Sequence, residues 1–218
     1  MHIFIVVPAF NEEKRIGHVL ADVKKTKLPV VVVDDGSTDR TFEVAKRYKV
    51  TALRHKVNLG KGAAMKTGAI AAFKLGANAV LFMDSDGQHS VNDIPKFIEQ
   101  IKANRAEIYF GRRIINKKVP GERFLGNKFA SLLTFWLYGV RVHDILCGFR
   151  AITKEAFKLI EWDSLGYEVE TEMAIKVGKK NLRYLEVPVE MIYYDNTKGL
   201  TLTSGIGIIF EILKWKLL

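Results

Sequence analysis

The sequence has little cysteine and no long uncharged apolar run. Cys147 is the only cysteine among the 218 residues, so the chain cannot form an internal disulfide and a reducing compartment is expected. No stretch reaches the roughly eighteen apolar residues that a bilayer-spanning helix requires, and the first residues lead directly into a predicted strand. We therefore expect neither a signal peptide nor a transmembrane helix, and we predict a cytoplasmic protein.

Acidic residues are scarce relative to basic ones. The chain has 24 Asp and Glu against 34 Lys and Arg, which gives a net charge of +10. Such an excess favours anionic partners, namely phosphorylated substrates, acidic lipid headgroups or nucleic acid. Apolar residues make up 48% of the chain, which is enough for a large core. We predict one α/β domain that spans residues 1–218.

The glycine-rich loops of common nucleotide-binding proteins are missing. No G-x-G-x-x-G follows the first predicted strand, which disfavours a dinucleotide fold. Residues 58–62, Asn-Leu-Gly-Lys-Gly, lack the G-x-x-x-x-G-K-[ST] spacing of a P-loop. A nucleotidyltransferase would need a glycine-rich triphosphate loop near the N-terminus, and residues 9–12, Ala-Phe-Asn-Glu, do not provide one. These three classes are therefore not predicted.

The first half of the chain alternates apolar strands with helices. The apolar runs are continuous, as in strands buried on both faces, and the segments between them have apolar residues at helical spacing. Right-handed crossovers then give a doubly wound, mostly parallel sheet whose ligands bind at the carboxyl ends of the strands. The predicted strands are 3–7, 30–33, 50–53, 79–83 and 106–110, and the predicted helices are 12–24, 40–48, 62–75 and 92–103.

Polar clusters follow four of these strands, at the edge where ligands are expected. They are residues 8–13, 34–39, 58–64 and 84–88. Each cluster alone could be a turn or a helix cap, but four clusters in the functional position predict one shared site.

Asp84 and Asp86 follow the apolar run 79–83 and are candidates for metal chemistry. Carboxylates two residues apart at the end of a strand point the same way. Both could therefore bind one Mg²⁺ or Mn²⁺, with the Gln88 carbonyl as a third oxygen ligand. Such a cation could hold a diphosphate and neutralise it as a leaving group. An ordinary acidic turn is the alternative.

Several motifs occur in order along nearly the whole chain: Val-Pro-Ala-Phe-Asn-Glu at 7–12, Val-Asp-Asp-Gly-Ser at 33–37, Asn-Leu-Gly-Lys-Gly at 58–62, Asp-Ser-Asp-Gly-Gln-His at 84–89, Gly-Arg-Arg at 111–113, Asp-Ile-Leu-Cys-Gly-Phe-Arg-Ala at 144–151 and Val-Pro-Val at 187–189. Together they resemble family 2 glycosyltransferases of the GT-A fold, in the branch of dolichyl-phosphate mannose synthases and polyprenyl-phosphate glycosyltransferases. The resemblance implies metal-dependent transfer of a hexose, with inversion, from a nucleoside-diphosphate sugar of the GDP-mannose or UDP-glucose type to a dolichyl or polyprenyl phosphate.

The resemblance also implies roles for individual residues. A carboxylate can accept hydrogen bonds from a base or a ribose, and a nucleoside pocket is implied at Pro8, Phe10, Glu12, Val33 and Asp35. The metal and the diphosphate are implied at Asp84, Ser85, Asp86 and Gln88. No role is predicted for Glu168 and Glu170.

Basic residues in the second half predict contacts with phosphate. Arg113 closes the Gly-x-Arg motif, Arg123 follows the predicted loop 114–122, and Lys198 lies near the C-terminus, where relatives often have a basic residue over the phosphates. Arginine binds phosphate oxygens in a bidentate manner, so these residues suit the acceptor phosphate or the donor diphosphate. A solvated basic loop is the alternative.

The acceptor decides the role of Asp144. A lipid phosphate is already anionic near neutral pH and needs no strong base. A saccharide hydroxyl acceptor, the alternative, would need a base, and Asp144 is the candidate. Asp144 could instead pair with Arg150 or cap a turn. A non-enzymatic nucleic-acid-binding module is indicated only by the charge, so no nucleic-acid partner is predicted.

Two apolar stretches that include lysine or arginine predict contact with a membrane surface. They are residues 120–140 and 202–218. The alternative is that they pack on the core or form a subunit interface. With the reducing compartment expected above, this predicts a location at the cytoplasmic face of the membrane.

Overall fold

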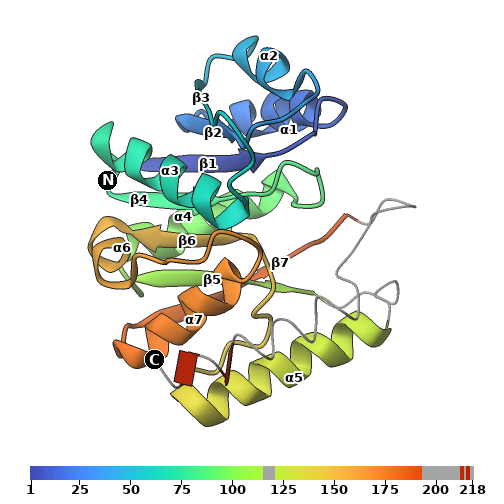
Figure 1. Ribbon diagram of the computed structural model, residues 1–218. Helices are drawn as coiled ribbons and strands as arrows, with labels where there is room; N and C mark the ends of the chain where they lie inside the picture. Colours follow the sequence, from blue (N-terminus) through green and yellow to red (C-terminus); the bar gives the residue numbers. More distant parts are fainter. Residues whose placement is uncertain (115–120, 193–211, 214, 217–218) are drawn as a thin grey trace.

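One seven-stranded sheet forms the centre of the protein (Figure 1). The structure is a computed structural model that describes residues 1–114, 121–192, 212–213 and 215–216, with only the backbone described at 121–125. Its strands are β1 (Ile3–Ala9), β2 (Val30–Asp34), β3 (Thr51–Arg54), β4 (Ala79–Phe82), β5 (Ile108–Arg113), β6 (Arg150–Thr153) and β7 (Tyr184–Val189). Its helices are α1 (Ile16–Val23), α2 (Thr41–Lys46), α3 (Lys61–Lys74), α4 (Ile94–Lys102), α5 (Gly121–Tyr138), α6 (Lys154–Ile160) and α7 (Val169–Lys179), with 3₁₀ turns η1 (Lys24–Thr26) and η2 (Val91–Asp93).

The strands are ordered β3-β2-β1-β4-β6-β5-β7. Strand β6 runs antiparallel to both of its neighbours, β4 and β5, whereas the other adjacent strands pair in parallel. The predicted doubly wound, mostly parallel sheet is thus confirmed. The antiparallel β6 was not predicted, because the alternation of apolar strands and helices that indicates parallel pairing is clear only in the first half of the sequence.

Helices cover both faces of the sheet, and each face has its own apolar core. Along β1, Val6 belongs to one core and its neighbours Ile5 and Val7 to the other, because successive side chains of a strand point to opposite faces. Residues of α3, α5, α6 and α7 complete the first core. Residues of α1, α2 and α4 complete the second. Burial on both faces explains why these strands are continuous apolar runs.

Two helix starts position polar residues at the ligand edge. Helix α1 begins at Ile16 and not near Glu12, and it follows a turn in which the Glu12 carbonyl accepts the N–H groups of Arg15 (3.0 Å) and Ile16 (2.9 Å). Helix α3 begins after Gly60, whose φ is +98°. A Cβ on Gly60 would lie 2.3 Å from the carbonyl oxygen of Leu165, so only glycine allows this close approach.

The predicted stretch 120–140 is largely the helix α5. Most of the predicted stretch 202–218 lies outside the described residues. Of its described part, Ile212 is buried, and its carbonyl accepts a 2.6 Å hydrogen bond from the Tyr138 hydroxyl at the end of α5. Among the described residues, none of the helices combines the length and apolar character needed to cross a bilayer.

Candidate active site

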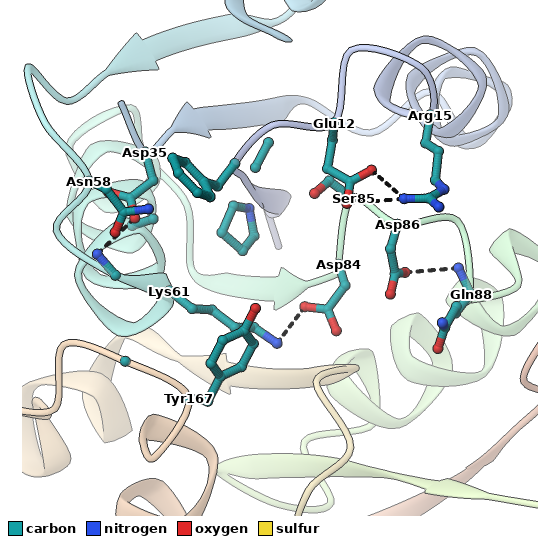
Figure 2. A pocket seen from close by; sticks show the side chains of 16 residues that line it. Glu12, Arg15, Asp35, Asn58, Lys61, Asp84, Ser85, Asp86, Gln88 and Tyr167 are labelled. Carbon is teal, nitrogen blue, oxygen red and sulfur yellow. Dashed lines mark hydrogen bonds and ion pairs between the residues drawn. The ribbon is translucent and has the colours of Figure 1, made fainter. Parts of the chain in front are cut away.

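A cavity of about 670 Å³ lies at the edge where β1, β2 and β4 end (Figure 2). This volume suits a small-molecule ligand. All four polar clusters predicted from the sequence contribute to it, as does the segment before α7. The lining residues are Pro8, Ala9, Phe10, Glu12 and Arg15 from the end of β1, Asp35 after β2, Asn58, Gly60, Lys61 and Ala64 around the start of α3, Asp84, Ser85, Asp86 and Gln88 after β4, and Gly166 and Tyr167 before α7.

The residues that follow β1 form one wall of the cavity. Phe10 is 43% exposed, so its ring is available to cover a base. The Glu12 carboxylate pairs with Arg15 at 3.1 Å. Burial raises the pKa of Glu12, and Arg15 partly offsets this. The wall therefore combines an aromatic surface with a carboxylate, which suits a nucleoside.

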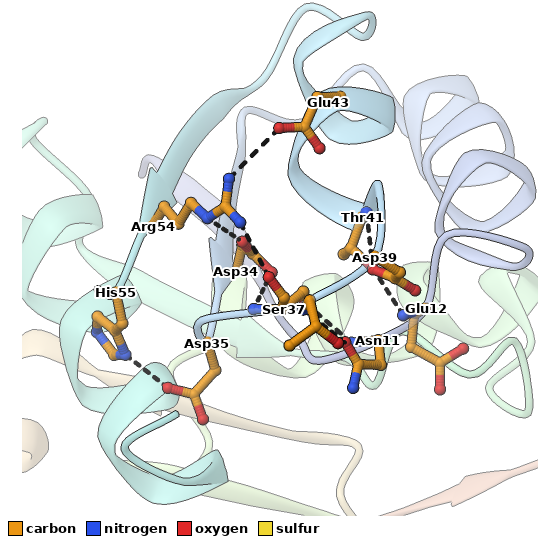
Figure 3. Close-up of polar contacts among 11 residues, drawn as sticks. Asn11, Glu12, Asp34, Asp35, Ser37, Asp39, Thr41, Glu43, Arg54 and His55 are labelled. Carbon is orange, nitrogen blue, oxygen red and sulfur yellow. Dashed lines mark hydrogen bonds and ion pairs between the residues drawn. The ribbon is translucent and has the colours of Figure 1, made fainter. Parts of the chain in front are cut away.

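Adjacent aspartates at the end of β2 have different surroundings (Figure 3). Asp34 is fully buried and pairs with Arg54 at 3.0 Å, away from the cavity. Asp35 lines the cavity and accepts hydrogen bonds from the N–H groups of Leu59 (3.0 Å) and Gly60 (2.7 Å). Its Oδ1 also lies 2.6 Å from Nδ1 of His55. A carboxylate has about four acceptor positions, so Asp35 orders the loop before α3 and retains capacity for a ligand.

Asp84 is held by three surrounding residues. Its Oδ1 lies 2.6 Å from Lys61 Nζ, and its backbone N–H donates to Nδ1 of His89 (3.2 Å). A Cβ on Gly148 would lie 2.3 Å from Asp84 Oδ2, so the glycine leaves room for the carboxylate. Burial by itself raises the pKa of Asp84, but Lys61 and the other basic groups nearby together outweigh it, and the pKa falls below its usual value. Burial lowers the pKa of His89 to about 4, so Asp84 is ionised beside a neutral imidazole.

Asp86 points into the same cavity, and its Oδ1 accepts the Gln88 backbone N–H at 2.9 Å (Figure 2). Burial, with the nearby charge of Asp84, raises the pKa of Asp86 to about 6. At neutral pH two ionised carboxylates therefore face one cavity at an electrostatic cost. A bound cation would relieve that cost.

The donor set around Asp84 and Asp86 fits Mg²⁺ or Mn²⁺. Among the described residues, no three His, Cys, Asp or Glu side chains converge on one metal position. Mg²⁺, however, is usually bound by one or two carboxylates together with substrate phosphates, not by an all-protein cage. Two aspartates and the Gln88 amide in an open cavity match that pattern. These three residues would hold the metal predicted from the sequence.

Asp144 pairs with Arg113 and not with Arg150, the partner considered from the sequence. Its two carboxylate oxygens accept from Nε and a terminal nitrogen of Arg113, both at 2.6 Å. Asp144 is buried, and neither residue of the pair lines the cavity. Arg150 is fully buried and donates instead to backbone carbonyls, among them those of Cys147 (2.6 Å) and Glu170 (2.9 Å). Asp144 thus orients an arginine at the end of β5.

The other predicted site residues have mixed placements. Ser85 lines the cavity between the two aspartates. Val33 is fully buried in the core that residues of α3, α5, α6 and α7 complete, and it does not line the cavity. Arg123 lies in α5, but its side chain is outside the described part, and Lys198 lies outside the described residues.

A comparison with protein-family models agrees with this geometry. The model described as glycosyl transferase family 2 matches residues 4–160. The chain belongs to glycosyl transferase family 2. This family 2 chain is 37% identical over 224 residues to an uncharacterised protein of Methanocaldococcus jannaschii, covering 99% of the chain and 92% of that protein. It is 33% identical over 241 residues to the UDP-N-acetylglucosamine–dolichyl-phosphate N-acetylglucosaminyltransferase of Methanococcus voltae, covering 99% and 96%.

The fold of this family 2 glycosyltransferase is GT-A. Its structure matches the glucosyl-3-phosphoglycerate synthase of Mycobacterium tuberculosis crystallised with Mn²⁺, UDP and phosphoglyceric acid, with a TM-score of 0.75. The match covers 99% of this chain and 78% of that protein at 20% sequence identity. The predicted family, fold and enzyme class are therefore confirmed.

Several cavity residues were not assigned a role from the sequence. Lys61 stands in the predicted cluster 58–64 and could have been singled out because it lies between two glycines, Gly60 and Gly62, in a segment after a strand. Arg15 and Tyr167 line the cavity without a motif that marks them. His55 and His89 act on aspartates through contacts that arise only on folding.

Proposed function

We propose that this glycosyltransferase moves one hexose from a nucleoside-diphosphate sugar to a dolichyl or polyprenyl phosphate, with Mg²⁺ or Mn²⁺. The observation that carries the proposal is a single cavity where Asp84 and Asp86 face the loop that bears Phe10 and Glu12. A nucleoside and a diphosphate would span these two walls. The relative from Methanococcus voltae, whose name includes a dolichyl-phosphate acceptor, supports the acceptor class.

The donor would lie with its base and ribose beside Pro8, Phe10, Glu12 and Asp35. Its diphosphate would lie beside Asp84, Ser85, Asp86 and Gln88, which also hold the cation. The cation supplies charge neutralisation of the departing nucleoside diphosphate. The contacts of Asp35 with His55 and with the backbone N–H groups before α3 would hold its carboxylate in one orientation toward the base.

The acceptor phosphate needs no deprotonation, because it is already anionic near neutral pH. One of its oxygens attacks the anomeric carbon, the bond from that carbon to the diphosphate oxygen breaks, and the leaving group keeps the electron pair. A single displacement of this kind inverts the anomeric centre. Asp144 is buried and committed to Arg113, which favours a phosphate acceptor over a saccharide hydroxyl that would need Asp144 as base. Arg113, oriented by Asp144, is the described candidate for contact with a phosphate, together with the predicted Arg123 and Lys198.

The whole chain is proposed to act as a single domain at the membrane surface. Helix α5 exposes Phe129, Leu132, Phe135 and Trp136, the last by 79%. An exposed aromatic and aliphatic face next to basic residues suits a helix lying in the headgroup region. A subunit interface through the same face is the alternative, and the location at the cytoplasmic face remains a prediction.

The test is a screen of GDP- and UDP-sugars against a short polyprenyl phosphate, with the product identified by mass spectrometry. One sugar nucleotide is expected to give the polyprenyl-phosphate sugar with Mg²⁺ or Mn²⁺, and none is expected to do so in excess EDTA. Transfer only to a saccharide hydroxyl would contradict the proposed acceptor. Full activity in EDTA would contradict the proposed metal.

A further inference from the structure

Lys61 places its ammonium group between two acidic side chains at the cavity. Its Nζ lies 2.6 Å from Asp84 Oδ1 and 2.7 Å from Glu170 Oε1. Two carboxylates within hydrogen-bonding distance favour the charged form of the Lys61 amine. Figure 2 shows its side chain reaching from the start of α3 to Asp84. A positive charge is thus already paired with the carboxylate proposed to bind the cation.

Glu170 is fixed in place by the surrounding chain. It lies in the first turn of α7, is 3% exposed, and has its backbone carbonyl held by Arg150 at 2.9 Å. Its second carboxylate oxygen, Oε2, is buried and accepts no hydrogen bond from the described residues. An unsatisfied buried carboxylate oxygen is unfavourable. Glu170 therefore has unused capacity to accept a donor.

We propose that Lys61 is an internal counter-ion for Asp84, and that Glu170 is the positioning residue that receives its ammonium group when a divalent cation binds. This inference rests on the proposed function. An ammonium group and a divalent cation on the same carboxylate repel each other, so binding of the cation weakens the contact between Lys61 and Asp84. Oε2 of Glu170 then offers the ammonium a second acceptor on a carboxylate that it already contacts.

The exchange has a consequence for the donor. Lys61 lines the cavity, and Glu170 keeps its ammonium there after Asp84 has been released. The ammonium then donates a hydrogen bond to the diphosphate of the nucleotide. Lys61 thus neutralises Asp84 in the unloaded protein and contributes to diphosphate binding in the loaded one. Glu170 determines which of the two positions is favoured.

The first test measures Mn²⁺ binding by electron paramagnetic resonance without nucleotide. The double variant Lys61→Met/Glu170→Gln removes one positive and one negative charge, so the local net charge is unchanged while Asp84 loses its ammonium partner. We expect Mn²⁺ to bind about tenfold more tightly, the equivalent of one charged hydrogen bond. In the single variant Glu170→Gln, Asp84 is the one carboxylate of the two that remains to pair with Lys61, so Mn²⁺ binding is expected to weaken. Equal or weaker binding by the double variant would overturn the proposal.

The second test measures UDP and GDP binding by calorimetry at saturating Mn²⁺. The double variant is expected to bind the preferred nucleotide about tenfold more weakly, because the ammonium donor is gone. Unchanged nucleotide affinity would overturn the second role of Lys61. If the wild-type protein binds neither nucleotide, the proposed function fails instead, so the two failures are distinguishable.

A matched control lies on the same helix. Lys66 of α3 pairs with Glu161 at 3.0 Å and does not line the cavity, so Lys66→Met/Glu161→Gln is expected to leave both affinities unchanged. Circular dichroism establishes folding of each variant. If the double variant does not fold, Lys61→Arg replaces it. The guanidinium of this arginine can contact Asp84 and Glu170 at the same time, so Asp84 keeps its positive partner and we expect weaker Mn²⁺ binding. Unchanged or tighter Mn²⁺ binding would overturn the proposal.

Discussion

At the scale of single residues, the repulsion between two carboxylates in the cavity lowers the stability of the folded protein. Asp86 has its pKa raised from 3.8 to about 6, by burial and by the charge of Asp84. Between these two values the native state keeps a proton that the unfolded chain has lost. The stability due to that proton is fully present below about pH 4 and is lost as the pH rises through about 6.

Asp86→Asn should therefore stabilise the metal-free protein above pH 6. We expect a gain of about 1–3 kcal/mol in the free energy of unfolding at pH 8 and little difference at pH 4. Urea denaturation in EDTA at the two pH values measures this. Turnover is expected to be abolished, because a proposed metal ligand is lost. A variant that is less stable than the wild type at pH 8 would contradict the raised pKa of Asp86.

Asp144→Asn tests whether that carboxylate holds Arg113 or removes a proton. It weakens a part-buried ion pair with two 2.6 Å hydrogen bonds, in which the Arg113 side chain is 29% exposed, and we expect a loss of about 1–2 kcal/mol in stability. If Asp144 only orients Arg113, the pH profile of turnover keeps its shape in the variant, although the rate falls. Loss of a limb of that profile, with the protein still folded, would identify Asp144 as a base.

These residues also show what a sequence can predict. Asp84 and Asp86 were predictable because they follow a strand, and strand ends share one edge. The pairing of Lys61 with Glu170 was not, because their two segments are far apart in the chain and meet only in the folded protein. The same holds for Asp144, for which the sequence offers the nearby Arg150, but β5 brings Arg113 closer. The position of a motif can thus be predicted from the local sequence, whereas the residue that pairs with a charged side chain depends on tertiary packing.

At the scale of elements, the connection from α5 to β6 sets the position of Asp84. Gly148 of this connection packs so closely that a Cβ would lie 2.3 Å from Asp84 Oδ2. Gly148→Ala is therefore expected to displace the carboxylate and weaken Mn²⁺ binding at least tenfold, the loss of about one charged contact. Gly126→Ala in α5, where a Cβ would meet nothing within 4 Å, is the control. It should leave Mn²⁺ binding unchanged and gain up to about 1 kcal/mol in stability.

Element boundaries depart from the sequence expectation for local physical reasons. The helix predicted from residue 12 begins at Ile16, which is where the apolar spacing of the helix itself begins, and residues 13–15 form a turn before it. The strand predicted over 106–110 is β5, which extends to Arg113 because it pairs with β7 along its whole length.

At the scale of the whole molecule, the exposed face of α5 predicts membrane binding. Phe129→Ser/Leu132→Ser/Trp136→Ser is expected to reduce sedimentation with vesicles of anionic lipid by about tenfold or more, because three large apolar side chains no longer enter the headgroup region. With a net charge of +10, binding should also weaken as salt is raised. Leu159→Ser, which alters a leucine of α6 that is 53% exposed, is the control. Unchanged sedimentation of the triple variant, with altered oligomeric state, would instead indicate a subunit interface.

Because β6 runs antiparallel, two different kinds of segment reach the ligand edge of the sheet. Because β6 opposes its neighbours, it is the amino end of this strand that reaches the ligand edge, together with the connection that enters it from α5. The loops proposed to bind the nucleotide follow the carboxyl ends of parallel strands, whereas residues 144–148 precede the amino end of β6. This segment, whose Asp144 orients Arg113, could therefore change without altering the strands that carry the proposed donor site. A chimaera exchanging residues 114–149 between relatives would be a natural way to transplant acceptor choice.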